Sequence, residues 1–282
     1  MFFFLVNDPL GSMKIISLGL SSPYSLLMLY LIVFISLFAF VIFVFYKMYY
    51  KTTKQFPVNW HSVLLIEVGF YKRLVASEQK RFQNRMMQFL GEVYIDTVGF
   101  EIEELDTILI ASSAVIPVFG FKDWHYPTVT GIIIYPDNFN EDFEFSDKSG
   151  PRRIAGSIGT GRLENKMILS RKALHHGFKN SKDKRNTAIH EFVHLIDKMD
   201  DNVDGVPKIL MQNMNTIPWL KLVHDKMEAI NKDKSDIRAY GGTKQAEFFA
   251  VASEYFFENP KLMKRKHPEL YKMMAECFRV KF

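Results

Sequence analysis

The sequence has a single cysteine, Cys277, among its 282 residues. One cysteine excludes an internal disulfide framework and any zinc ribbon that needs several cysteine ligands. A metal ion, if the chain binds one, must therefore be held by histidine and carboxylate side chains. The cysteine itself lies in the C-terminal run from 260 to 282, where we expect it to be packed in an amphipathic helix that caps the domain.

Blocks of charge of one sign are also missing. Lysine and arginine number 36 and acidic residues 31, which gives a net charge of +5. Because the basic residues are dispersed and no recognition motif accompanies them, we expect no nucleic-acid partner. Hydrophobic residues make up 48% and charged residues 24%, which is typical of a globular protein and excludes wholesale disorder.

The segment from 26 to 46 lacks charge altogether and reads LLMLYLIVFISLFAFVIFVFY. Spanning the hydrocarbon layer takes roughly 20 apolar residues in a helix. A signal peptide would have a shorter apolar region and a small-residue cleavage site, and a core helix would show a polar stripe. The segment has neither the features of a signal peptide nor the polar stripe of a core helix, so it predicts a transmembrane helix.

Lys47, Lys51 and Lys54 follow this segment directly, whereas Lys14 and Asp8 precede it. The excess of positive charge on the C-terminal side predicts that this side is cytoplasmic, so we expect a single-pass protein of the inner (cytoplasmic) membrane. The predicted organisation is an N-terminal tail over 1–25, the transmembrane helix over 26–46, a linker over 47–59 and one domain over 60–282.

The domain itself reads as strands first and helices later. Helical spacing with a glycine at its end predicts a helix over 76–91, and helical patterns dominate from 186 onward. The segment 137–164, rich in Asp, Asn, Gly and Lys, is predicted as a loop. The runs that predict strands are 92–98, 107–119, 131–136 and 165–170. This order is typical of an α+β domain with helices gathered on one side of a small mixed sheet.

The most informative motif is His190-Glu191-Phe192-Val193-His194. On a helix, the two histidines lie one turn apart on the same face and can bind one cation. Glu191 then projects beside the metal, where it can accept a proton from a bound water. The alternative is a pair of helix-surface histidines with ordinary hydrogen bonds.

A zinc site needs a third protein ligand, and no third histidine follows at metzincin spacing. Glu247 and Glu254 lie two turns apart on a largely apolar helix, so one could bind metal while the other supports a histidine. Tyr240, beside a glycine pair, could donate a hydrogen bond to the oxyanion of a tetrahedral intermediate. The alternatives are a solvated face or salt bridge for the glutamates, and packing at a helix entrance for the tyrosine.

Two long stretches, HEFVHLIDKMDDNVDGVP at 190–207 and IRAYGGTKQAEFFAVASEYFFENP at 237–260, resemble the Mlc titration factor A (MtfA) family of zinc-dependent peptidases. The likeness extends to the segments QKRFQNRMMQFL, GIIIYPDNF and NKMILSRKAL. The pattern Tyr-Gly followed by Ala-Glu-Phe-Phe-Ala is also distantly similar to the catalytic domain of anthrax lethal factor. Both are gluzincin-like peptidases, whose third zinc ligand is a glutamate, and the resemblance implies a zincin-like metallopeptidase fold.

The resemblance gives a role to each candidate residue. Glu191 becomes the general base and Tyr240 the transition-state donor, while Glu254 supports the site and Asp197 has a structural or orienting part. The implied ligands of Zn²⁺ are His190, His194 and Glu247.

We therefore predict a membrane-anchored zinc peptidase with peptide or protein substrates. Strand 131–136 is our candidate for an exposed sheet edge that pairs with an extended peptide. One alternative is a regulatory module that sequesters a transcription factor or another cytoplasmic partner, with zinc mainly structural. Another is a scaffold that uses only the anchor and a protein-binding groove. The resemblance adds a transcriptional regulator as a partner, although the best-known family members are soluble and the segment 1–55 lies outside the family core.

Overall fold

A computed structural model describes the chain in two compact units, Met1–Thr52 and Thr53–Phe282. The residues that it describes are 3–7, 13–17, 23–49, 55–141, 144, 154–180, 183–200, 202–208, 210–211 and 216–282.

The first unit contains a two-stranded hairpin and one long helix. Strand β1 (Phe3–Asn7) pairs antiparallel with β2 (Met13–Ser17), and α1 runs over Pro23–Tyr49. Within α1, the stretch Leu26–Val44 has a mean hydropathy of 3.0 over 19 residues and is exposed throughout. Its length and composition suffice to cross a membrane, although a signal sequence meets the same criteria.

The second unit is mostly helical, with one small mixed sheet. Its strands are β3 (Tyr94–Thr97), β4 (Gly131–Tyr135), β5 (Gly156–Ile158) and β6 (Lys166–Ser170). The α-helices are α2 (Trp60–Glu67), α3 (Gly69–Lys72), α4 (Ala76–Glu92), α5 (Glu104–Val115), α6 (Arg171–Lys179), α7 (Thr187–Asp197), α8 (Thr216–Asn231), α9 (Gln245–Glu258), α10 (Pro260–Lys266) and α11 (Pro268–Cys277). The 3₁₀ helices are η1 (Ile116–Val118), η2 (Gly161–Leu163), η3 (Lys198–Asp200) and η4 (Ala239–Gly242).

The strand order of this sheet is β3-β4-β6-β5. Strands β3, β4 and β6 are parallel, whereas β5 pairs antiparallel with β6. The prediction of a strand over 131–136 is confirmed, but its assignment as the exposed edge is wrong. Strand β4 pairs on both sides, with β3 and with β6, so its main-chain groups are used inside the sheet. In the described chain, the edge strands are β3 and β5.

The run 107–119, predicted as a strand, is instead helix α5 followed by η1. Nearly all of its side chains are buried, so its sequence shows neither the period of a strand nor that of a one-sided helix. The helix is started by a capping box, in which the Asp106 side chain accepts the backbone N–H of Glu103. Four small residues in succession, Ala111 to Ala114, then allow neighbouring helices to approach.

Part of the segment 137–164 also departs from its prediction as a loop, since β5 and η2 lie within it. Strand β5 reads only Gly-Ser-Ile, which is too short to show alternation, and it forms because β6 offers a pairing edge. The predicted elements over 76–91, 92–98 and 165–170 are confirmed as α4, β3 and β6.

The C-terminal run is divided into α10 and α11 at His267-Pro268, because a residue before proline is disfavoured in the helical conformation. Cys277 is buried in α11, as expected.

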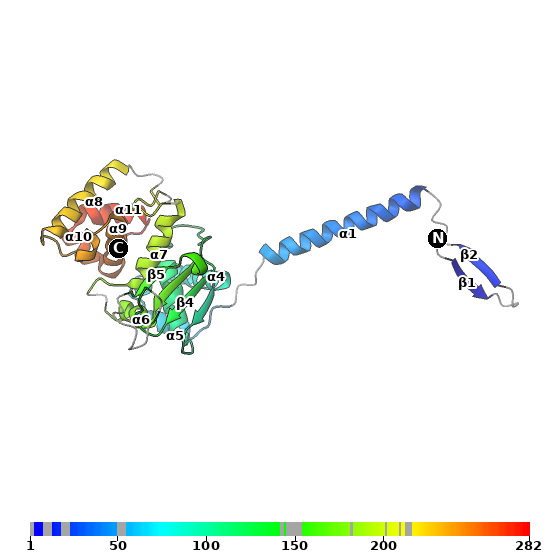
Figure 1. The fold of residues 1–282 in the computed structure, drawn as a ribbon, viewed down its shortest axis with the longest axis horizontal. Helices are drawn as coiled ribbons and strands as arrows, with labels where there is room; N and C mark the ends of the chain where they lie inside the picture. The colour runs from blue at the N-terminus through cyan, green and yellow to red at the C-terminus, as the bar shows by residue number, and fades with distance from the viewer. Residues whose placement is uncertain are drawn as a thin grey trace. The chain divides into compact units, whose positions relative to one another are not determined.

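Within the second unit, helix α7 lies between the sheet and the C-terminal helices (Figure 1). It contacts β5, α5 and α6 on the side of the sheet and α9 on the side of the C-terminal helices. Ile189, Phe192, Val193 and Ile196 are at most 1% exposed. The apolar positions of α7 are thus used on two sides, which leaves a narrow face for polar side chains.

A buried carboxylate joins the start of α5 to α6. Asp106 is fully buried, with its Oδ1 at 2.8 Å from Arg171 Nε and 2.6 Å from His175 Nε2. Burial opposes its negative charge, but the hydrogen bonds from Arg171, His175 and Glu103 hold the pKa of Asp106 below its usual range. The ionised carboxylate therefore stabilises the fold.

Replacing Asp106 by asparagine should lower the free energy of unfolding by about 3 kcal/mol at pH 7, because it leaves buried donors without a charged partner. A pKa lower in the folded than in the unfolded state contributes stability above about pH 4, and this is lost as the pH falls further. The difference from wild type should therefore shrink below about pH 4. Urea unfolding at several pH values measures this, with the exposed Asp225→Asn as control. A difference that stays constant down to pH 2 would contradict it.

Candidate metal centre

The two histidines of the motif are placed by the first turns of α7. Asn186 caps this helix, and its Oδ1 accepts the backbone N–H of Ile189 at 3.1 Å. One turn further on, the Nε2 atoms of His190 and His194 lie 3.0 Å apart. Both imidazoles therefore present the same nitrogen to one point in space.

Glu247, in the first turn of α9, completes a three-residue cluster with these histidines. Its Oε2 lies 3.1 Å from His190 Nε2 and 3.4 Å from His194 Nε2. Donor atoms about 2.1 Å from a tetrahedral metal ion are about 3.4 Å from one another. The three donor atoms thus have a spacing that fits a metal ion.

The charges of the cluster are also those of a metal site. Burial opposes the charge of Glu247, but hydrogen bonds from both histidines hold the pKa of its carboxyl well below its usual range. Burial likewise opposes a charge on His190, but its hydrogen bonds to Glu247 and Glu254 raise its pKa to about 10. In the metal-free chain a proton is therefore held where a cation would bind, and metal binding would release it.

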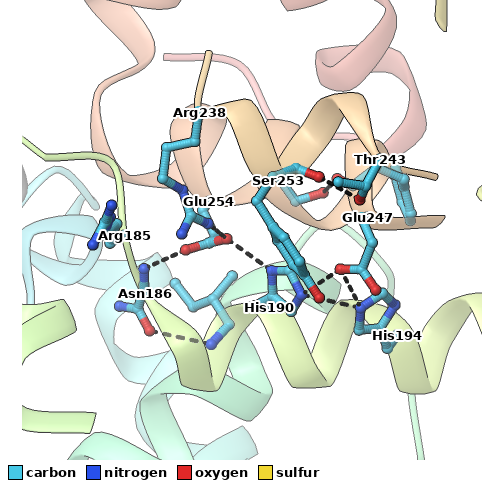
Figure 2. A network of polar contacts seen from close by, with 12 residues as sticks. Arg185, Asn186, His190, His194, Arg238, Thr243, Glu247, Ser253 and Glu254 are labelled. Carbon is cyan, nitrogen blue, oxygen red and sulfur yellow. Dashed lines mark hydrogen bonds and ion pairs between the residues drawn. The ribbon is translucent and has the colours of Figure 1, made fainter. Parts of the chain in front are cut away.

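The other nitrogen of His190 is held by Glu254, two turns along α9 from Glu247 (Figure 2). Glu254 is 1% exposed, and its Oε1 lies 2.8 Å from His190 Nδ1. Its carboxylate also accepts the backbone N–H of Asn186 at 2.6 Å and a hydrogen bond from the Arg238 guanidinium. These contacts fix the ring of His190 with Nε2 turned toward the cluster.

Tyr240 and Glu191 lie beside His190 in the wall of one cavity of about 580 Å³. Burial and the nearby charge of Glu247, with which it also hydrogen-bonds, raise the pKa of Tyr240 to about 12, so the phenol stays protonated and can donate. Burial also raises the pKa of Glu191, against the lowering effect of the two histidines. The arrangement combines a cluster that could hold a metal ion, a carboxylate that can take up a proton and a hydrogen-bond donor.

Comparison with known proteins agrees with this geometry. The model of the glucose-regulated metallo-peptidase M90 family matches residues 46–279. The chain belongs to this family. It is 29% identical over 240 residues to Mlc titration factor A of Escherichia fergusonii, with 81% of this chain and 88% of the relative covered. It is 24% identical over 234 residues to an uncharacterized protein of Synechocystis sp., with coverages of 80% and 85%.

The M90 family match begins at residue 46, so most of α1 and the hairpin before it precede the matched region. The matched region contains every candidate site residue of the sequence analysis, and the structure brings these residues together from α7, η4 and α9. The family assignment and the His-His-Glu cluster together indicate a metal site.

Gly156, in the edge strand β5, contributes to the site and was missed by the sequence analysis. A Cβ atom at this position would lie 2.7 Å from Cγ and 2.8 Å from Oε1 of Glu191, closer than such atoms approach. It would also lie 2.8 Å from Cγ2 of Thr187. Only glycine therefore lets β5 run this close to the motif helix. The one sequence signal was a glycine in a region that reads as loop.

The glycine pair after Tyr240 matters for close packing. Gly241 and Gly242 are not among the described glycines with positive φ, so no unusual backbone angle is needed there. Close approach is needed at Gly242, where a Cβ would lie 2.2 Å from Oδ1 of Asn231. Gly242 therefore lets η4 pack against α8.

Asp197, at the end of α7, orders the chain that follows the motif. Its side chain is fully buried, and Oδ2 accepts the backbone N–H of Gly205 at 2.8 Å. Gly205 has a φ of +76°, and a Cβ there would lie 2.4 Å from the carbonyl oxygen of Gln245. Asp197 thus holds a turn against the start of α9, two residues before Glu247.

Loss of the α9 glutamates should weaken metal binding to different degrees. Glu247→Ala removes a donor and should abolish stoichiometric zinc binding, whereas Glu254→Gln loosens His190 and should weaken affinity by about 10- to 100-fold. Competition with a chromogenic chelator measures both, with the exposed Glu269→Gln as control. Wild-type affinity in Glu247→Ala would contradict this assignment.

Alanine at position 156 should destabilise the fold by about 1–3 kcal/mol, because its Cβ overlaps Glu191 and Thr187. Gly91→Ala is the matched control: nothing lies within 4 Å of a Cβ there, and the position is helical. That change should stabilise the chain by about 0.5–1 kcal/mol. Chemical unfolding of both variants tests the pair, and equal effects would show that β5 does not pack this closely against α7.

Proposed function

We propose that the chain is a membrane-anchored zinc peptidase that hydrolyses peptide bonds. The observation that carries this proposal is the convergence of the His190, His194 and Glu247 donor atoms in a chain of the M90 metallo-peptidase family. Two imidazoles and one carboxylate, with the fourth position open, are the donor set of catalytic zinc sites.

Each polar residue around the cluster has a part in this chemistry. Zinc, when bound, would supply an electrophile and lower the pKa of water toward about 7. Glu191 takes the proton of the attacking water and delivers it to the leaving amine. Tyr240 donates a hydrogen bond to the carbonyl oxygen of the scissile bond as negative charge develops there. His190 is kept in the correct orientation by Glu254.

The surroundings of Glu191 favour an enzyme over a module with structural zinc. Glu191 is 7% exposed, and its carboxylate makes no hydrogen bond to any residue that the structure describes. A buried carboxylate without a partner costs free energy, and a purely structural site would not need one. General-base chemistry is a reason to keep such a group beside the cluster.

The substrate backbone has a place to bind along β5. Ala155 and Gly159 direct main-chain groups toward β6, so alternation directs those of Gly156 and Ile158 to the open side of the strand. An extended peptide that pairs with these groups would pass directly beside Glu191. Strand β5 thus takes the part that the sequence analysis gave to 131–136.

Location and partners follow from the rest of the chain. We propose that α1 anchors the protein in the inner membrane and that the matched region lies on the cytoplasmic side, as the following lysines indicate. Lys51 and Lys54 lie outside the described residues. A second candidate function is the sequestration of a transcriptional regulator, because several relatives are named Mlc titration factor A.

Glu191→Gln in the full chain should retain zinc and lower kcat/KM for peptide cleavage by about 10²–10⁴-fold, since it removes the proton acceptor. Tyr240→Phe should lower kcat by about 10²–10³-fold with little change in KM. Mass spectrometry of a mixed peptide library reveals cleavage, with the exposed Glu228→Gln and Tyr94→Phe as controls.

Equal turnover in wild type and Glu191→Gln would refute the mechanism. Zinc binding without cleavage by wild type would instead favour the regulator-binding function, which copurification with a transcriptional regulator would then test.

A further inference from the structure

The cavity beside the metal cluster has a basic end that the proposed chemistry does not use. Besides His190, Glu191 and Tyr240, its wall includes the start of α6, the residues before α7 and the first part of β5. The basic side chains of the wall are Lys172, His176, Arg185 and Arg238. Its acidic residues are Glu191 and Glu254.

The two acidic residues of the wall lie against other groups than the remaining basic side chains. Glu254 is surrounded by Asn186, His190 and Arg238, which satisfy its carboxylate (Figure 2). Glu191 lies at the other end of the cavity, against Gly156. Neither carboxylate is paired with the remaining basic residues of the wall.

Those basic residues differ in their availability. Lys172 lies 3.3 Å from Asp137, and His176 lies 2.7 Å from Asp183. The guanidinium of Arg185, by contrast, makes no hydrogen bond or ion pair with any described residue. Its backbone is held, because the Arg185 N–H donates to Asp183 Oδ1 at 3.1 Å. Arg185 thus combines a fixed backbone with a guanidinium whose planar fork suits a carboxylate.

We propose that this end of the cavity binds a carboxylate of the substrate through Arg185, so that the peptidase prefers acidic peptides. The inference rests on the proposed function. The carboxylate can belong to an aspartate or glutamate side chain or to the C-terminus of a peptide, and the experiment below separates the two sources. Lys172 and the positive N-terminal end of α7 add favourable charge.

The distance along α7 fits a peptide that reaches both ends of the cavity. Arg185 directly precedes the cap of α7, and from the first helical residue, Thr187, Glu191 lies about 6 Å further along the helix axis at 1.5 Å per residue. An extended peptide advances about 3.3 Å per residue. A carboxylate two or three residues from the scissile bond would therefore lie at Arg185.

The first test is direct binding, measured without turnover on the full-length Glu191→Gln protein loaded with zinc. The probes are fluorescein-labelled decapeptides of alanine and serine, amidated at the C-terminus. Each peptide has one glutamate, placed at a different position in each, and a matched peptide has glutamine at the same position. At low salt, the glutamate peptide should bind at least about 10-fold more tightly than its glutamine counterpart at one or two positions. A glutamine-free, glutamate-free peptide with a free C-terminus tests the other source of the carboxylate.

Arg185→Ala in the same protein should reduce this preference to near unity, and Arg185→Lys should retain part of it. Arg162→Ala, an exposed arginine outside the cavity wall, is the matched control and should leave the preference unchanged. In the active protein, Arg185→Ala should raise KM for acidic peptides and leave kcat little changed.

With Arg185 intact, equal binding of all peptides, with neither a glutamate side chain nor a free C-terminus improving affinity, would overturn the inference. The same improvement with and without Arg185 would overturn it as well. A preference for acidic peptides that depends on Arg185 would support it even if no peptide were cleaved, in which case the proposed function would fail while the binding site stands.

Discussion

The geometry of this site depends on the hydrogen bonds that the buried carboxylate of Glu254 accepts. This carboxylate is almost completely buried and accepts hydrogen bonds from the start of α7, from the ring of His190 and from Arg238, two residues before Tyr240. A buried charge is tolerated only when it is well paired, so α7, α9 and the segment before η4 must assemble together around it. Loss of any one donor would leave the charge under-compensated and move a ligand histidine.

A second carboxylate, which is half-buried, holds the same segment. Asp236 accepts hydrogen bonds from Tyr255 at 2.9 Å and from His267 at 2.7 Å. It also forms an ion pair with Lys184 at 3.2 Å. Burial opposes its charge, but these partners hold the pKa of Asp236 well below its usual range. The segment that carries Arg238 is therefore tied to α9, to the turn between α10 and α11 and to the chain before α7, which restrains where Tyr240 can lie.

The sequence predicted those parts of the site that depend on local spacing. Histidines one helical turn apart and glutamates two turns apart share a face in any α-helix, so the candidate donor residues were recognisable before the fold. The spacing left open which glutamate completes the cluster, and the family resemblance selected Glu247. Gly156 and Arg238 were missed because their roles depend on pairing between distant segments. Helix α5 was predicted as a strand because burial on all sides erases its period, and β5 has only three residues.

The two places that the proposals assign to a substrate, the metal cluster and Arg185, are separated along α7, and this separation suits a peptide bound in one direction. Glu191, near the middle of α7, lies beside the cluster where a metal ion would bind, and Arg185 directly precedes the N-terminal end of the helix, where the dipole is also positive. Arg238 and Glu254 form an ion pair between these two places, so their charges cancel and this part of the cavity wall has no net charge. A substrate with its scissile carbonyl at one end and its carboxylate at the other would match this separation, and the same peptide reversed along β5 would not. Orientation of the substrate would thus follow from the separation of the metal cluster and Arg185 along a single helix.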